Sequence, residues 1–402
     1  MLKSIELDTA IEIMSSLTAC PQVEMVPLEQ ALGHILAEDI RAEFPMPPFD
    51  KSPFDGFALR AADMPGTLPV TAVLAAGETN VAPLQPGTAV RIFTGAPVPE
   101  RADVVVKQED VVYTETEATF SMAMASGTNV IRAGEDYPSG ALLARRGDKI
   151  TPSRWGVLAS QGFSRLPVYK RPKAVILSTG SELSAPGMTR PTYGIYNSSY
   201  YTLRGYLEAM GFQVTPDRIL PDDAEMISDA VKENMETDAD LVITTGGASV
   251  GDYDFALTTA KNIGAEILFW KVHMKPGGAL LVSRKGEKVL LGLSGNPAAA
   301  LMCLLTAVQP FLRKLTGSTL GNQELRLPIY RDMPKSSSGT RMLRGHLHIE
   351  GGKAYFEENE GRKNGNIASF NGCSLIGVIP GGTGPVAAGE EIRVFRLPDD
   401  LV

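Results

Sequence analysis

The sequence of 402 residues is poor in the residues that build disulfides and thiolate metal sites. It holds three cysteines, Cys20, Cys303 and Cys373, which lie far apart, and only four histidines. An odd number of scattered cysteines argues against a disulfide framework and against a cysteine zinc site, and it is typical of a reduced, cytosolic protein. We therefore expect a cytoplasmic protein whose chemistry depends on other side chains.

The chain also lacks an excess of positive charge and a long hydrophobic run. Its 38 Lys and Arg residues against 46 Asp and Glu residues give a formal net charge of -8. This balance argues against nucleic acid as a partner, because nonspecific binding to nucleic acid needs a basic surface. No apolar signal segment is visible, and the most apolar stretch, residues 298–308, is too short to cross a bilayer. We expect no membrane partner.

Four regions differ in their sequence pattern. Residues 1–41 are predicted to be mainly helical, with Asp8 capping a first helix and a second helix in residues 27–40. Residues 42–139 hold short apolar runs between Gly and Pro, which predicts a small β-rich unit, and residues 140–170 return to a helix-like pattern. Residues 171–319 alternate strand and helix patterns, which indicates an α/β domain with a mostly parallel sheet, including one strand in residues 212–220. Residues 320–402 predict a small closing β domain.

Two predicted strands of the α/β region end in a Thr-Gly step. Thr179-Gly180 precede Ser181, and Thr245-Gly246-Gly247 open a loop that continues through Ser249 and Gly251. Ligands of parallel sheets bind at the carboxyl ends of the strands, and glycine lets backbone N–H groups approach an anion such as a phosphate. The spacing is neither a P-loop, since Asp252-Tyr253 replace its Lys and Ser or Thr, nor G-x-G-x-x-G. The alternative is that the glycines only make tight turns.

Charged residues follow the same strand ends. Hard oxygen ligands of the kind that hold Mg²⁺ together with phosphates are offered by Glu182, Asp222 or Asp223, Asp252 and Asp254. Helix capping explains at least one of Asp222 and Asp223. Lys271 and Lys275 stand four residues apart before Pro276-Gly277-Gly278 and are candidates for binding an oxyanion; the alternative is two surface lysines. Asn296 can cap the next helix with Pro297 at its first position, which creates another anion site.

The order of these motifs along nearly the whole chain resembles the MoeA family of molybdopterin molybdenumtransferases, which includes the gephyrin E domain of animals. The matching stretches are SPFDGFAL, RIFTGAPVP, RAGED, STGSEL, NSSYYTL, TTGGASVGDYDF, FWKVHMKPG, GLSGNP and AAGEEIRV. DGFA and TGAPVP are specific to the family, whereas TTGG also occurs in the related MogA and CinA proteins.

The resemblance implies a four-part architecture. An elongated helical dimerisation domain comes from residues 1–41 and 140–170, an inserted β-rich domain from 42–139, a MogA-like α/β molybdopterin-binding domain from 171–319, and a β-barrel-like domain from 320–402. It implies a head-to-tail homodimer in which the α/β domain of one chain faces the inserted domain of the other. A MogA-type adenylyltransferase is the implied protein partner.

The implied reaction inserts molybdenum from molybdate into adenylylated molybdopterin, with Mg²⁺-dependent cleavage of the adenylate and release of AMP. The family's functional positions fall on Asp55, Thr94, Asp136, Glu182, Asp222, Asp254, Lys271, Lys275 and Pro297. Residues expected to bind the substrate are Thr179, Gly180, Ser181, Thr245, Gly246, Gly247, Ser249, Gly251 and Asn296, and Glu182 and Asp254 are expected to hold the metal.

Two stretches depart from the family pattern. The chain has Gly278-Ala279 where the family usually has Lys-Pro, and Ser294 where it has Pro. Both departures lie near the expected oxyanion pocket, so a catalytically weakened paralogue that carries or scaffolds the pterin is the main alternative. A CinA-type nucleotide enzyme is a third reading, but it does not predict DGFA or TGAPVP. The residues fit molybdate and tungstate alike.

Overall fold

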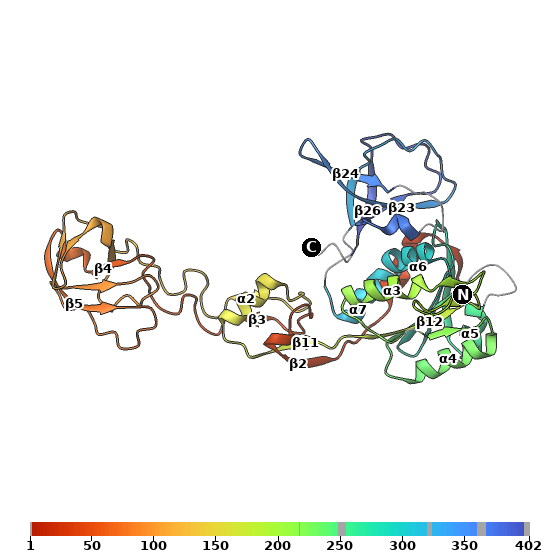
Figure 1. Cartoon of the computed structure of the whole chain (residues 1–402), viewed down its shortest axis with the longest axis horizontal. Helices are drawn as coiled ribbons and strands as arrows, with labels where there is room; N and C mark the ends of the chain where they lie inside the picture. The colour runs from red at the N-terminus through yellow and green to blue at the C-terminus, as the bar shows by residue number, and fades with distance from the viewer. Residues whose placement is uncertain (1, 217, 248–254, 320–323, 360–366, 398–402) are drawn as a thin grey trace. The chain divides into compact units, whose positions relative to one another are not determined.

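The computed structural model describes residues 2–216, 218–247, 255–319, 324–359 and 367–397 (Figure 1). The chain divides into two compact units. The first comprises Met1–Glu38, Arg146–Pro152 and Arg165–Val402, and the second comprises Asp39–Arg145 and Ser153–Ser164. The four domain boundaries given above stay a prediction.

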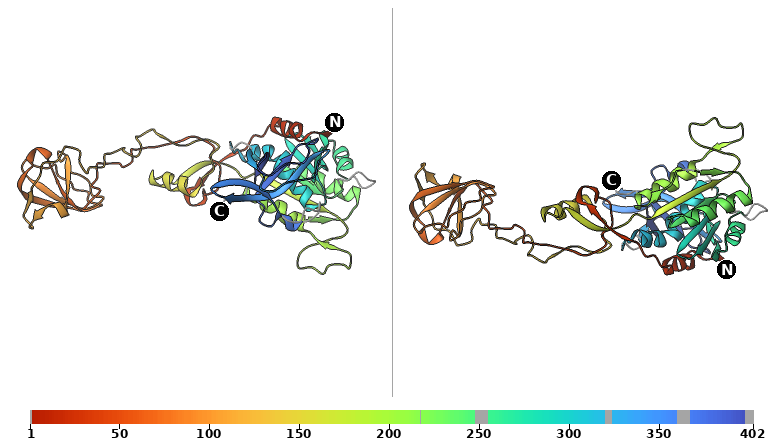
Figure 2. Two further views of the ribbon diagram at one scale, coloured as in Figure 1. Left: turned by 90° about the horizontal axis from the view of Figure 1, so that it is seen from above. Right: turned by 90° about the horizontal axis from the view of Figure 1, so that it is seen from below.

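An eight-stranded sheet forms the centre of the first unit (Figure 2). Its order is β1 (Leu2–Ile5), β18 (Glu266–Val272), β20 (Leu280–Lys285), β21 (Lys288–Leu293), β17 (Leu241–Thr245), β12 (Lys173–Thr179) and β15 (Gln213–Val214), with β16 (Arg218–Leu220) also pairing with β12. β15, β16, β12, β17 and β21 are parallel. β20 is antiparallel to both of its neighbours, so β18 runs in the same direction as β21. The predicted α/β class is confirmed.

Helices cover both faces of this sheet (Figure 1). On one face lie α1 (Leu7–Ser16), α3 (Ser198–Ala209), α6 (Pro297–Cys303), the π-helical turn η4 (Leu304–Val308) and α7 (Gln309–Thr316). On the other lie α4 (Ala224–Glu236) and α5 (Phe255–Asn262). Successive side chains of a strand point to opposite faces, so Ala174 and Ile176 pack in the first layer and Val175 and Leu177 in the second. Burial on both faces explains why these strands are apolar without alternation.

The run from α6 through α7 is longer than the sequence pattern suggested. Pro297–Thr316 is a continuous 20-residue helical segment, long and apolar enough to cross a membrane, so the expectation of too short a segment is wrong. However, 83% of an 18-residue window within that stretch is buried inside the protein, where the stretch contacts α1 and the sheet. The π-helical turn precedes Pro310, which has no N–H to donate to the preceding turn.

The N-terminal segment differs most from its prediction. The second helix expected in residues 27–40 is only the 3-10 turn η1 (Leu28–Gln30), because the following residues pair with residues 148–150 and 167–169 instead. Asp8 is not the cap of α1: Glu6 holds that position, and Asp8 lies in the first turn and pairs with Arg393. β1 joins the edge of the central sheet through β18. The strand expected over residues 212–220 is two short strands, β15 and β16.

The rest of the first unit consists of β structure. β2 (Val23–Pro27) pairs antiparallel with β11 (Arg165–Tyr169), and β13 (Leu183–Ser184) pairs with β14 (Ile195–Tyr196). The C-terminal sheet has the order β19 (Met274–Lys275), β23 (Thr340–Glu350), β25 (Leu375–Ile379), β26 (Glu391–Arg396) and β22 (Glu324–Pro328), with β24 (Lys353–Glu358) paired to β23. The short 3-10 turn η5 (Ile367–Phe370) precedes β25. The predicted β-rich C-terminal region thus supplies five strands of a six-stranded sheet, and β19 is the sixth.

The second unit is built around another six-stranded sheet. Its order is β7 (Val104–Lys107), β4 (Gly56–Leu59), β6 (Ala89–Ile92), β5 (Gly66–Leu74), β9 (Glu117–Phe120) and β8 (Val112–Tyr113), and η2 (Ala61–Asp63) and η3 (Gln108–Asp110) connect strands. Two apolar cores cover its faces, with Phe57 in one and Ala58 in the other. β3 (Ile40–Arg41) pairs with β10 (Leu142–Ala144). In place of the helix-like pattern of residues 140–170, the structure has β10, the single helix α2 (Pro152–Ser160) and β11.

Candidate active site

Three loops meet at the carboxyl edge of the parallel strands. β12 ends at Thr179, β17 at Thr245 and β21 at Leu293. The Thr179 hydroxyl donates a hydrogen bond to the carbonyl of Thr245 (2.9 Å), and the amide of Gly246 donates to the carbonyl of Leu293 (3.1 Å). The structure therefore brings together the two Thr-Gly loops and the start of the loop that leads to α6.

The glycine at position 246 is required by this close approach. It adopts φ +95°, and a Cβ built on it would lie 2.4 Å from the carbonyl oxygen of Thr179 and 2.5 Å from its hydroxyl oxygen. On its other side, Gly295 approaches so closely that its own Cβ would lie 3.3 Å from the Gly246 Cα. Only glycine combines such a φ with such close contact, so this crossing is a place where backbone, not side chain, faces the site.

The two neighbouring aspartates after β16 have different partners. Asp223 is the N-cap of α4, where its carboxylate accepts hydrogen bonds from the amides of Glu225 (3.0 Å) and Met226 (2.8 Å). Asp222 points to the end of β12 instead: its carboxylate accepts from the Ser181 amide (3.0 Å), and its own amide donates to the Ser181 hydroxyl (3.2 Å). Asp222 is thus the one of the pair that lies at the edge of the sheet.

Glu182 lies beside the same loop. A Cβ built on Gly180 would be 2.7 Å from Glu182 Oε2, which shows that the exposed carboxylate folds back over Gly180. The carbonyl of Glu182 accepts from the Ile195 amide (2.8 Å), at the point where β13 and β14 pair. Glu182 and Asp222 therefore present carboxylates next to the Gly180-Ser181 backbone.

The lysines stand at the end of β18, on the same edge of the sheet. Lys271 has φ +72°, rare for a residue other than glycine, and its ammonium lies 4.3 Å from the centre of the Trp270 ring. Lys275 is exposed on β19, in register with Arg341 of β23. The Cys303 thiol donates to the carbonyl of Gly277 (2.8 Å), which ties this loop to α6. Lys271 and Lys275 thus belong to one loop between the central sheet and the C-terminal sheet.

Helix α6 begins next to this loop. Asn296 is its N-cap and accepts hydrogen bonds from the amides of Ala298 (3.0 Å) and Ala299 (3.3 Å), and Pro297 occupies the first turn. The predicted cap is confirmed, and Asn296 Oδ1 is used in capping.

One residue that the sequence analysis missed is Arg344. It is 6% exposed, and its Nη1 has no hydrogen-bond partner in the part of the chain that the structure describes. Burial lowers the pKa of this guanidinium, and Cys373 and Glu358 partly offset that effect. The sequence could have indicated this residue, since the arginine stands within the apolar run MLRGHL. Arginine is rarely buried without a partner, so its place in such a run suggests a binding role. A buried guanidinium with an open N–H is suited to an anion.

The predicted residues of the second unit fall into two places. Asp55 accepts hydrogen bonds from the Thr94 amide (2.8 Å) and the Thr94 hydroxyl (2.7 Å) on the same carboxylate oxygen. These bonds, the backbone one first, lower the pKa of Asp55 and favour its ionised form. Asp136 donates its amide to the carbonyl of Met46 (2.9 Å), near the bridge between Met46 and Tyr137. Asp55 and Thr94 are joined, and no hydrogen bond links Asp136 to either in the described residues.

Part of the predicted site lies outside the described residues. Ser249, Gly251, Asp252 and Asp254 belong to residues 248–254. In the described ranges, no three His, Cys, Asp or Glu side chains are grouped so that they could hold a metal ion. The predicted metal pair, Glu182 with Asp254, stays a prediction.

Comparisons with known proteins match this geometry to one family. Residues 5–162 match the family model described as MoeA N-terminal region (domain I and II), and residues 175–314 match the probable molybdopterin binding domain. The chain is 33% identical over 383 residues to a protein of Staphylococcus aureus (strain Mu50 / ATCC 700699) named molybdopterin molybdenumtransferase, with 93% of this chain and 91% of that protein covered. The chain belongs to the MoeA family.

Other members extend the match over nearly the full length. The Bacillus subtilis (strain 168) protein of the same name is 32% identical over 410 residues, which cover 98% of this chain and 95% of that protein. A crystal structure of the molybdopterin biosynthesis MoeA protein from Pyrococcus horikoshii aligns with a TM-score of 0.83 at 26% identity and covers 98% of this chain and 99% of that one. The MoeA N-terminal match includes the Asp55 and Thr94 loops, as the DGFA and TGAPVP motifs predicted.

Proposed function

We propose that this MoeA-family chain catalyses the last step of molybdenum cofactor synthesis. In that step molybdenum from molybdate enters adenylylated molybdopterin, the adenylate is cleaved and AMP leaves. The observation that carries the proposal is the junction of Thr179, Thr245 and Gly246, where bare backbone faces the carboxyl edge of the sheet. Relatives named molybdopterin molybdenumtransferase over nine-tenths of their length support the choice of reaction.

The residues of this edge have distinct tasks in the proposal. The Gly246 crossing and the Gly180-Ser181 backbone receive the pyrophosphate, because backbone amides next to glycine can approach an anion without side-chain interference. Asp222 fixes Ser181 through two hydrogen bonds and so holds that loop in place. Lys271, Lys275 and the positive end of the α6 helix dipole attract the negatively charged substrates.

The donor set at this edge fits Mg²⁺. Glu182 and Asp222 carry exposed carboxylates next to the proposed pyrophosphate position, and carboxylates that share the ion with substrate phosphates are its usual protein ligands. When bound, the ion neutralises phosphate charge and polarises the bond that breaks. Asp254 is proposed as a further ligand.

Molybdate is proposed to bind where the central and C-terminal sheets join. Lys275 lies opposite Arg341 in the β19–β23 pair, and Arg344 follows on β23 with an open Nη1. Arg341, in register with Lys275, supplies positive charge near the stretch where Gly278 replaces the family's usual second lysine. Arg344 lies three residues further along β23, on its opposite face.

The test is AMP release from adenylylated molybdopterin. We expect release that depends on molybdate, stops in EDTA and returns when magnesium is restored. Binding of the pterin with no AMP release under any of these conditions would instead support the carrier reading. Release at equal rates with and without the chelator would remove the metal role from Glu182 and Asp254. Tungstate in a parallel arm measures the choice between the two oxyanions.

We further propose that the active species is a cytoplasmic homodimer that receives its adenylylated substrate from a MogA-type protein. Asp55, Thr94 and Asp136 would then act on the substrate bound by the other chain.

A further inference from the structure

An unusual backbone conformation places the side chain of Lys271 at the carboxyl end of β18. Its φ of +72° lies in the left-handed region, which is unfavourable for a residue other than glycine. In a regular strand, successive side chains point to opposite faces. Here Trp270 packs against the core on the α4 and α5 face, and Val272, two residues on, packs in the core on the other face. The alternation therefore breaks at Lys271, whose ammonium turns back to 4.3 Å from the centre of the Trp270 ring.

The indole ring of Trp270 is held by packing and by no hydrogen bond. Trp270 is in register with Lys3 of β1 and with Leu281 of β20. Its Nε1 is buried and has no hydrogen-bond partner among the described residues. A buried donor without an acceptor is unfavourable, and phenylalanine would fill an apolar space without that cost. Tryptophan has the strongest cation–π face, and a second ammonium, that of Lys3, lies 4.9 Å from the ring centre. The ring face thus distinguishes tryptophan from other apolar residues at this position.

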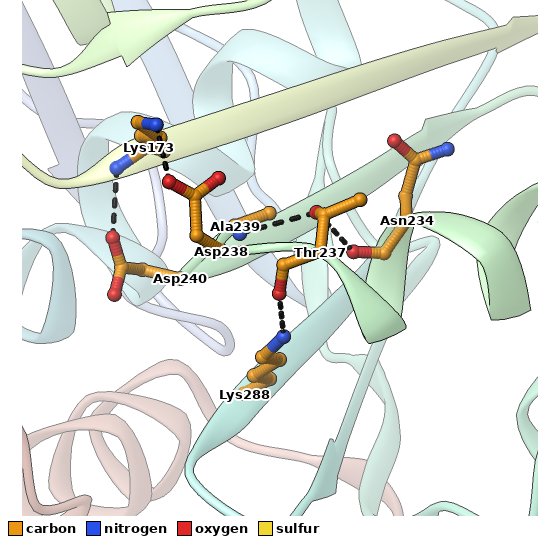
Figure 3. A network of polar contacts seen from close by, with 7 residues as sticks. All are labelled: Lys173, Asn234, Thr237, Asp238, Ala239, Asp240 and Lys288. Atoms are coloured by element: carbon orange, nitrogen blue, oxygen red, sulfur yellow. Dashed lines mark hydrogen bonds and ion pairs between the residues drawn. The ribbon is translucent and has the colours of Figure 1, made fainter.

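Lysines at the amino end of the same sheet are held by oxygen atoms instead (Figure 3). The Lys173 ammonium pairs with Asp238, and the Lys288 ammonium donates to the carbonyl of Thr237. Such contacts use the N–H donors of the lysine. Within the part of the chain that the structure describes, the Lys271 ammonium makes no hydrogen bond or ion pair. Its contact with the ring therefore leaves N–H donors open to an anion.

We propose that Trp270 is a positioning residue whose ring holds the Lys271 ammonium ready for an anionic group of the substrate. This role rests on the proposed function, in which Lys271 attracts the anionic substrates. The left-handed backbone turns the lysine onto the ring, and the negative ring face attracts and orders the ammonium. A long side chain that is ordered in advance loses less conformational entropy when it binds an anion. Trp270 acts through Lys271 and does not touch the substrate.

A double-mutant cycle tests this role in the full chain. The measurement is isothermal titration with inorganic pyrophosphate in the presence of magnesium. Trp270→Leu should weaken pyrophosphate binding by about two- to fivefold, the size of a cation–π contact at a partly exposed site. In a chain that already carries Lys271→Gln, Trp270→Leu should have no further effect, because the ring has no Lys271 ammonium to position. A tryptophan that only fills the core would weaken binding to the same degree in both backgrounds.

Lys3→Gln is the matched control. It removes the other ammonium beside the same ring, from the edge strand β1, and should leave pyrophosphate binding unchanged. Four results would overturn the role of Trp270: no pyrophosphate binding by the wild-type chain, no effect of Trp270→Leu, an equal effect with and without Lys271→Gln, or an effect of Lys3→Gln as large as that of Trp270→Leu. Thermal unfolding of each variant checks that it is folded.

Fluorinated tryptophan decides the matter if Trp270→Leu does not fold. The chain has two tryptophans, so Trp155→Phe leaves Trp270 as the single site of incorporation. Ring fluorine atoms withdraw electrons from the negative ring face and nearly preserve the shape of the side chain. Pyrophosphate affinity should fall step by step as one, two and three fluorine atoms are added, and it should not change in the Lys271→Gln background. An affinity that does not depend on fluorination would contradict the role of the ring.

AMP release measured beside the titrations separates this role from the proposed reaction. Coupling between Trp270 and Lys271 in a chain that binds pyrophosphate but releases no AMP would support the positioning role and contradict the reaction. Normal AMP release without such coupling would support the reaction and contradict the positioning role.

Discussion

Replacing Gly246 with alanine should damage the carboxyl edge of the sheet more than any neighbouring change of one methyl group. The new Cβ would lie 2.4 Å from the carbonyl oxygen of Thr179, about 1 Å inside the optimum contact distance of roughly 3.5 Å. Because the contact is with backbone and not with the end of a flexible side chain, β12 and β17 must move apart at their ends. The backbone at φ +95° is also unfavourable for alanine.

The two contributions can be separated with a matched glycine. Gly211, after α3, has φ +98°, and a Cβ built on it meets no atom within 4 Å. Gly211→Ala therefore carries only the conformational cost, about 1–2 kcal/mol. Gly246→Ala carries this cost and the overpacking cost of about 1–3 kcal/mol. The second variant should thus be less stable than the first by about 1–3 kcal/mol.

Calorimetry and AMP release measure the two consequences. At roughly 2–4 °C per kcal/mol for a domain of this size, Gly246→Ala should unfold roughly 2–12 °C below Gly211→Ala. AMP release by Gly246→Ala should fall by about 100-fold, since a displacement of about 1 Å in a site has effects of that order. Gly211→Ala should retain activity. If the two variants unfold at the same temperature and both release AMP normally, the close crossing of Gly246 and Thr179 does not organise the site.

Helix caps, hydrogen bonds and charges of the proposed site can each be tested by substitution. Asp223→Ala should lower the free energy of unfolding by about 0.5–2 kcal/mol, the cost of a lost helix cap, and should leave AMP release intact. Asp222→Ala should lower AMP release, because its carboxylate holds the Ser181 loop. The reverse result would exchange the roles of the two aspartates. Thr94→Val should raise the pKa of Asp55, measured by NMR, because a hydroxyl donor is lost. The stabilisation from the Thr94 bonds is present above the unfolded-state pKa of Asp55 and is lost as the pH falls through its lower folded-state pKa. If the stability of the variant depends on acidic pH as that of the wild type does, this role of the Thr94 hydroxyl is refuted. Gly278→Lys combined with Ser294→Pro should tighten molybdate binding in titration, and Lys275→Ala should weaken it. A Cβ at position 278 meets the carbonyls of Met274 and Val272 at 3.0 Å, so the loop must shift slightly to admit the lysine. Unchanged molybdate binding in both variants would place the anion elsewhere. Asp55→Asn and Glu182→Gln homodimers should each be nearly inactive. Refolding the two variants together should restore about a quarter of wild-type AMP release, because half of the dimers are mixed and every mixed dimer has one intact site of two. No recovery, with the mixed dimers confirmed by mass spectrometry, would contradict a site shared between chains.

The sequence by itself determined the features that depend on neighbouring residues. The buried strands β12 and β17, the cap of α6 at Asn296 and the glycine turn that ends β17 all follow from local pattern, because a strand's burial, a helix start and a turn each depend on a few neighbouring residues. The family motifs extended this local reading to membership of the MoeA family, and the matches over residues 5–162 and 175–314 confirm that membership.

Only the tertiary structure decided the features that depend on distant residues. The apparent helix at residues 27–40 stops at Gln30 because the backbone beyond it pairs with segments more than 100 residues away, and a local period cannot register that pairing. Asp222 and Asp223 are the same residue type in adjacent positions; they differ because one meets Ser181 from another strand end and the other meets its own helix. The burial of Arg344 and of Trp270 Nε1 likewise depends on which chain segments fold over them. A long-range contact changes the solvent exposure and hydrogen bonding of a side chain without changing its neighbours in sequence, and for that reason it had to be found in three dimensions.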